Sequence, residues 1–206
     1  MFRLINKFIF FTVLLIILII LYLTFIGVNT NKFNNLVKNK LLEFNPNYNL
    51  EIKDINFKLY PTKLKLNISS KKVIIGISNQ KLKLKKISAD VSIKSYFKGT
   101  YPVNNVKAET DVIDVKKLLK IVRNFKDNFQ LMILMKSIES GNSKIFVNIN
   151  LDERGKIKKN YFLKGFIKDL KISLLNDEYF DTNFDFTVNP NSIDIYDANI
   201  LFQKFK

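Results

Sequence analysis

Apolar and polar residues alternate along much of this chain, and this period of two constrains the fold more than any other feature. In the segment LKLNI, for example, Leu64, Leu66 and Ile68 alternate with polar residues. Successive side chains of a β-strand point to opposite faces, so such a segment predicts a strand with one apolar and one cationic face. The pattern returns through residues 50–112 and 145–195, with short connections marked by proline, glycine and asparagine. Closely spaced strands with short turns predict an antiparallel sheet.

An uncharged N-terminal stretch predicts a membrane anchor. Phe8–Val28 contains 21 residues without a charge, which is enough to cross a hydrocarbon core about 30 Å thick. The alternative is a cleaved signal peptide, whose apolar region is typically about 7–15 residues long and ends at a small-residue cleavage site. Here the stretch is longer, and the bulky Phe25 stands where a small residue is needed. Residues 1–28 are therefore expected to form a cytoplasmic tail and an uncleaved transmembrane anchor, although the flanking charges do not fix its orientation.

The segment that follows the anchor, residues 29–47, has the pattern of an amphipathic helix. Its apolar side chains fall on one helical stripe, which consists of Phe33, Leu36, Val37, Leu41 and Phe44. Two interpretations stay open. The helix packs on its own domain, or it lies at the membrane surface, because it begins close to the anchor and carries several lysines.

The remaining periodicities divide the chain into three parts. Residues 48–113 are predicted to form a first β-sheet segment, residues 114–140 a helical segment with Asp114 as its N-cap, and residues 141–206 a second β-sheet segment. The expected fold is therefore an N-terminal transmembrane helix followed by a mostly antiparallel β (α+β) domain. We expect a curved open sheet, or β-groove, with one or two helices.

The composition argues against several classes of function. The chain has neither cysteine nor histidine, so it lacks thiolate chemistry, the commonest general base and the commonest metal ligand. Its formal net charge is +16, which raises the question of nucleic-acid binding. However, nearly all the cations are lysines on alternate strand positions, as expected for the solvated face of a sheet. No nucleic-acid partner is therefore expected.

The acidic residues do not form a recognisable catalytic motif. Most of them sit at turns and strand ends, where aspartate makes local hydrogen bonds. No glycine-rich phosphate loop, nucleophile elbow or metal-spaced cluster accompanies them. The candidates considered are Asp111, Asp114, Asp152, Glu153, Asp177, Glu178, Asp181 and Asp185. The sequence thus predicts a protein without catalytic residues, cofactor or metal.

The order of these features resembles the N-terminal portion of the AsmA-like family, the group that includes AsmA, TamB and YhdP proteins. The resemblance lies in one membrane helix, a short helix, and then alternating strands broken at Pro61 and Gly99, with strands at Ile87–Ile93 and Val106–Val112. The segment GNSKIFVNINLDERGKIKKNYFLKGFIKDLKI is similar to the repeated strands of the YhdP-like branch. Such proteins are usually several times longer than this chain.

Membership of this family implies a bacterial inner-membrane protein with a single span and a periplasmic C-terminal domain. It implies a non-catalytic role in lipid transport or in outer-membrane assembly and homeostasis, with a phospholipid or another acyl lipid as the partner. The apolar side of the alternating strands is then the expected lipid groove. Its candidate residues are Leu64, Leu66, Ile68, Leu82, Leu84, Val91, Ile93, Val106, Ile145, Val147, Ile149 and Leu163.

Two alternatives follow from the same pattern. The apolar faces can close on the helices between Val115 and Ile138 as a private α+β core, in which case the protein is an anchored envelope scaffold that binds a protein partner. In addition, the C-terminal segment SIDIYDANILFQKFK reads as an apolar edge strand with little protection. An edge of this kind invites pairing with another strand, so we expect an envelope protein partner or self-association there.

Overall fold

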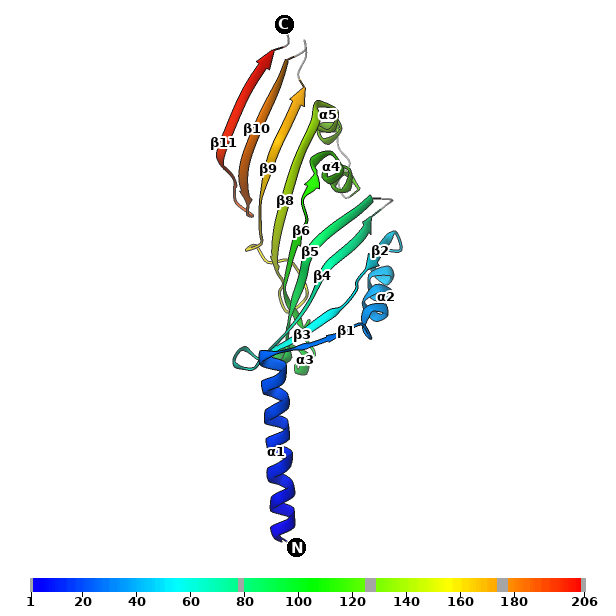
Figure 1. The fold of residues 1–206 in the computed structure, drawn as a ribbon, viewed down its shortest axis with the longest axis vertical. Coiled ribbons are helices and arrows are strands. Elements are labelled where there is room, and N and C mark those ends of the chain that lie inside the picture. The colour runs from blue at the N-terminus through cyan, green and yellow to red at the C-terminus, as the bar shows by residue number, and fades with distance from the viewer. Residues whose placement is uncertain (1, 78–79, 125–128, 174–177, 205–206) are drawn as a thin grey trace.

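The computed structural model describes residues 2–77, 80–124, 129–173 and 178–204. The chain begins with the helix α1 (Phe2–Phe25), which projects from one end of a long twisted sheet (Figure 1). Its 24 residues span about 36 Å at about 1.5 Å per residue. An 18-residue window within Arg3–Phe25 has a mean hydropathy of 3.0 and none of it is buried. By length and composition α1 can cross a membrane, a property that a signal sequence shares.

The rest of the chain is dominated by one open antiparallel sheet, as the alternation predicts. Every strand pairing is antiparallel, and the order is β1-β3-β4-β5-β6-β8-β9-β10-β11, with β2 and β7 pairing additionally with β4 and β8. The strands are β1 (Val28–Thr30), β2 (Tyr48–Glu51), β3 (Ile55–Tyr60), β4 (Lys65–Ile77), β5 (Gln80–Ser92), β6 (Val103–Thr110), β7 (Ile113–Asp114), β8 (Ile138–Asn150), β9 (Phe162–Ser173), β10 (Glu178–Val188) and β11 (Ile193–Lys204).

Short helices connect some of the strands. They are α2 (Asn34–Phe44), the 3-10 helix η1 (Pro61–Lys63), α3 (Ile93–Phe97), α4 (Val115–Arg123) and α5 (Phe129–Ser137). Asp114 caps α4, because its carboxylate accepts a hydrogen bond of 2.9 Å from the backbone N–H of Lys117. The predicted helical segment is thus present, but it ends earlier than residue 140, since β8 begins at Ile138. The helix α3 was not expected from the sequence.

The helix α2 packs on its own domain. The ring of Phe33, at its N-cap, contacts the ring of Phe57 edge-on, with centroids 5.4 Å apart. The side-chain amide of Asn34 donates hydrogen bonds to the carbonyl oxygens of Ile52 and Lys53. These contacts fix α2 beside β2 and β3, in agreement with the first of the two interpretations of this segment.

Interruptions in the alternation correspond to β-bulges. The register between β5 and β6 shifts at Lys85, which is an extra residue of β5 without a partner on β6. Because a bulge adds one residue to its strand, Leu84 and Ile87 on either side of the lysine pair lie on the same face. A similar shift occurs in β9 at Asp169, whose φ of 53° lies in the left-handed region. The bulges therefore bring apolar runs on either side of the polar pair to the same face of the sheet, although their spacing in the sequence would place them on opposite faces. They also bend the strands.

The core lies between α4 and part of the apolar face. One buried cluster consists of Ile77, Ile113 and Ile121, with Leu82 packed against it. A second consists of Val115, Ile138 and Leu170, with residues of β9 and β10 at its border. The apolar stripe of α4 thus closes on the sheet here, so the expected private core exists over this part of the face.

Candidate functional site

Apolar side chains form two rows that cross the sheet on one face. The first row joins successive cross-strand partners from β3 to β8, namely Phe57, Ile68, Ala89, Val106 and Ile149. The second row continues from β6 to β11 through Ala108, Val147, Leu163, Val188 and Ile193. Since Val106 and Ala108 are two residues apart on one strand, both rows belong to the same face.

Eight of the twelve predicted groove residues lie in strands on this face and are half-buried. They are Leu66, Ile68, Val91, Val106, Ile145, Val147, Ile149 and Leu163. None of these belongs to either buried cluster beneath α4. The structure therefore brings most of the predicted set together on a part of the sheet that the helical core does not include.

The other four candidates lie elsewhere. Leu84 is buried in the sheet and Leu82 packs in the cluster beneath α4, so both belong to the covered part of the face. Leu64 is not in a strand, because it follows η1 in the left-handed conformation and is 55% exposed. Ile93 begins α3. The proline turn delays the start of β4 by one residue, and α3 ends β5 one residue earlier than the sequence pattern indicates.

A glycine and a phenylalanine shape the middle of the apolar face. Gly165 lies between Ile145 on β8 and Phe186 on β10. A Cβ at this position would meet the backbone oxygen of Lys144 and would lie 3.1 Å from Cζ of Phe186. The ring of Phe186 therefore occupies the space that a side chain at residue 165 would take, and it keeps the face apolar at a residue that has no side chain of its own.

The opposite face is polar and largely hydrogen-bonded. Asn67 donates a hydrogen bond of 2.7 Å to Asp90, and Glu109 binds Lys144 at 2.7 Å and Lys85 at 3.2 Å. The hydrogen bond from Lys144 lowers the pKa of Glu109, and Lys85 acts in the same direction. This face therefore has the polar surface that the alternating lysines predict.

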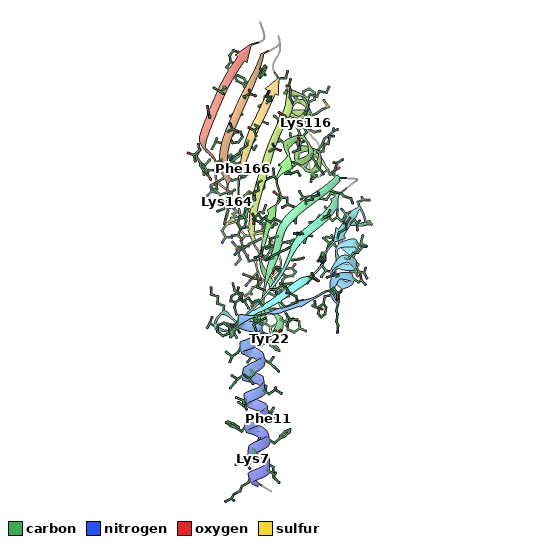
Figure 2. The ribbon with its side chains drawn as sticks, in the orientation of Figure 1. Lys7, Phe11, Tyr22, Lys116, Lys164 and Phe166 are labelled. Atoms are coloured by element: carbon green, nitrogen blue, oxygen red, sulfur yellow. The ribbon has the colours of Figure 1, made fainter. Side chains whose placement is uncertain are left out.

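Lysines on this polar face also cover aromatic rings. The ammonium of Lys164 lies 5.6 Å from the ring centroid of Phe146, and that of Lys168 lies 5.1 Å from that of Phe166. Figure 2 shows Lys164 and Phe166 close together on β9. The aliphatic stems of such lysines shield the rings while their charges stay in water. The two faces of the sheet are thus chemically distinct, one apolar and one cationic.

Two of the acidic candidates, Asp114 and Asp152, serve local structure. Asp114 caps α4, and the carboxylate of Asp152 accepts hydrogen bonds from the backbone N–H groups of Arg154 and Lys156 in its turn. The bond from Lys156, followed by that from Arg154, lowers the pKa of Asp152. Asp177 lies outside the described residues. Within the part of the chain that the structure describes, no group of three acidic side chains is placed to hold a metal ion.

The bulges at Lys85 and Asp169 were not predicted from the sequence, although a signal for them was present. Two of the register shifts coincide with a pair of polar residues, Lys85-Lys86 in β5 and Lys168-Asp169 in β9. Two polar residues between two apolar runs predict a bulge, because one extra residue restores both runs to one face.

Comparison of the chain with protein-family models, with curated proteins and with solved structures found no match. The fold, its two faces and the apolar helix are therefore the observations on which a function can be built.

Proposed function

We propose that this chain is a membrane-anchored, non-catalytic envelope protein of AsmA type that takes part in lipid transport or outer-membrane assembly. In this proposal acyl chains of phospholipids, or of another acyl lipid, lie against the apolar sheet face. The main support for this proposal is the extent of the apolar rows. The apolar rows run across the strands from β3, beside the strand that follows α1, to β11 at the opposite edge of the sheet.

This apolar path is long enough to hold an acyl chain. From β3 to β11 the strand order contains seven inter-strand steps, which cover about 34 Å at about 4.8 Å per step. Full exposure to water raises the free energy of an acyl chain of about 16 carbons by about 13 kcal/mol, at about 0.8 kcal/mol per methylene. An open apolar face shields one side of the chain, so it recovers roughly half of that free energy. Such a surface lowers the barrier to transfer without a catalytic group.

The anchor defines the expected topology. The N-terminus lies in the cytoplasm, and residues from Asn29 onward lie in the periplasm of a bacterial cell, because a large C-terminal domain is translocated largely regardless of its charge. A periplasmic reporter fused after Lys206 should be active. Activity of a cytoplasmic reporter at the same position would contradict both the topology and the proposed envelope function.

Site-specific photocrosslinking in native membranes tests lipid binding directly. Val147 and Asn148 are neighbours on β8 and point to opposite faces of the sheet. A photoreactive residue at position 147 should yield adducts that contain lipid, as identified by mass spectrometry of the purified protein. The same residue at position 148 is the matched control and should yield none. Equal lipid labelling at both positions, or none at either, would refute an acyl-binding face.

The alternative function is a scaffold that binds a protein partner, and the edge strand β11 favours it. Ile195, Ile200 and Phe202 are 59%, 64% and 56% exposed, and the outer edge of β11 pairs with no other described strand. Strand addition at such an edge joins two chains. Concentration-dependent self-association in sedimentation, reduced by Ile200→Pro without loss of strand content, is the result expected for an active edge. Protein adducts instead of lipid adducts at position 147 would favour the scaffold.

A further inference from the structure

The end of the sheet next to α1 carries a small surface that the lipid-binding proposal does not use. Val28 of β1 pairs with Phe57, so β3 runs from Phe57 towards the end of α1, and α1 contacts β3. The turn after β3 and the helix α3 both lie at this end, where Figure 1 shows α3 beside the top of α1. The backbone N–H of Ile93 joins them by donating a hydrogen bond of 2.9 Å to the carbonyl oxygen of Leu64. We call residues 60–64 and 93–98 the proximal rim.

The proximal rim exposes large apolar and aromatic side chains. Phe97 is 82% exposed, which is the highest value among the large hydrophobic residues that the structure describes. Tyr96 is 70% exposed and Leu64 is 55% exposed. The rings of Tyr96 and Phe97 contact each other edge-on, with centroids 5.9 Å apart. Together they form a patch of aromatic and aliphatic surface next to an apolar helix.

Local structure holds these side chains outward. Leu64 has φ 46° and ψ 49°, a left-handed conformation that a leucine rarely adopts. Its backbone N–H donates to the carbonyl oxygen of Pro61, which closes the turn. The hydroxyl of Ser92 accepts a hydrogen bond from the backbone N–H of Ser95 and caps α3. The exposed patch is therefore part of ordered turns.

Three lysines flank the patch. Lys63 ends η1, Lys94 lies in α3 and Lys98 follows α3. None of the three forms an ion pair with another residue in the described part of the chain. Tyrosine, phenylalanine and lysine together are the residues that accumulate where a protein meets the headgroup region of a bilayer.

We propose that the proximal rim lies in the headgroup and upper acyl region of the membrane that α1 enters. Leu64, Tyr96 and Phe97 insert beside the lipid chains, and the lysines contact lipid phosphates. This inference rests on the anchoring role of α1 given above. It deepens the proposed function, because the apolar face begins next to the rim. Leu66 on β4 and its partner Val91 on β5 are each two residues away from a rim residue. Acyl chains then reach the face from the bilayer without crossing water.

The absence of tryptophan from the chain makes a clean test possible. The full chain with the single substitution Phe97→Trp is placed in nanodiscs of phosphatidylcholine and phosphatidylglycerol, with or without lipids brominated in the upper acyl chain. We expect blue-shifted emission and quenching by the brominated lipids. The substitution Phe11→Trp in α1, whose side chain points away from the helix in Figure 2, is the positive control. Leu201→Trp in β11, an exposed position at the far edge of the sheet on the face opposite the apolar rows, is the negative control.

The controls separate failure of the rim from failure of the anchor. Quenching of Phe11→Trp together with an unquenched, water-exposed Phe97→Trp would overturn the rim proposal and leave the anchor intact. If neither variant is quenched, both the anchor and the rim are refuted. Tyr96→Trp provides a second reporter at the rim, and circular dichroism confirms that each variant keeps its strand content. A blue shift of the rim reporters that requires an added envelope protein extract would assign the patch to a protein partner and contradict the membrane proposal.

Discussion

An aspartate substituted at each of two positions on the apolar face should distinguish an open face from a closed core, because only a closed core removes the carboxylate from water. Val147→Asp lies in the open row, between Ala108 on β6 and Leu163 on β9. Val73→Asp lies opposite Leu84, where the valine is only 1% exposed. We expect Val147→Asp to fold and Val73→Asp to be close to unfolded.

The magnitudes follow from hydration of the carboxylate. Full burial of a valine side chain contributes about 1.5–3 kcal/mol. Val147 is half-buried, and an aspartate there keeps its water, so the free energy of unfolding should fall by about 1 kcal/mol. At Val73 the whole contribution is lost, and an ionised group is also removed from water at a cost of several kcal/mol. The total, more than about 5 kcal/mol, approaches the stability of a typical domain.

Denaturant unfolding of the full chain in nanodiscs, followed by circular dichroism, measures both changes. Asn148→Asp on the polar face is the control and should change the stability by less than about 0.5 kcal/mol. The defect of Val73→Asp should shrink as the pH falls, because burial raises the pKa of the new carboxyl and protonation removes its charge. If Val147→Asp proves as damaging as Val73→Asp, the face around Val147 is covered and cannot hold a lipid.

Three further predictions concern single residues. Ser143 is fully buried and its hydroxyl has no hydrogen-bond partner in the described structure, so Ser143→Ala should raise the free energy of unfolding by about 1 kcal/mol in the same assay. Gly165→Ala places a Cβ against the backbone oxygen of Lys144 and should destabilise the fold by about 3 kcal/mol, whereas Gly99→Ala enters open space and should cost only about 1–2 kcal/mol through its φ of 67°. Because the pKa of Glu109 is lowered in the folded state, its contribution to stability is present above pH 4.5 and is lost as the pH falls through the lowered value. Lys144→Met should reduce this acid-induced loss in an unfolding titration, and an unchanged pH profile would contradict it.

Local patterns were sufficient to predict most of the elements of this fold, although not α3. The uncharged stretch predicted α1, the alternation predicted antiparallel strands, and Asp114 before an amphipathic stripe predicted the start of α4. Each of these signals depends on neighbouring residues only, since helix caps and strand faces are determined within a few positions. For the same reason, eight of the twelve groove candidates were placed on one face without knowledge of the pairing.

Long-range pairing decided the rest. The pairing of β6 with β8 joins strands separated by α4 and α5, and no local pattern specifies which strands meet across such a connection. The choice between an open face and a private core also depends on where α4 docks, which is why Leu82 is covered while Val147 is not. The sequence shows that Leu64 and Ile93 are apolar, but only the turn and α3 place them at the end of the sheet beside α1. Periodicity determines which side of a strand is apolar, whereas burial depends on which segments distant in sequence pack against that side.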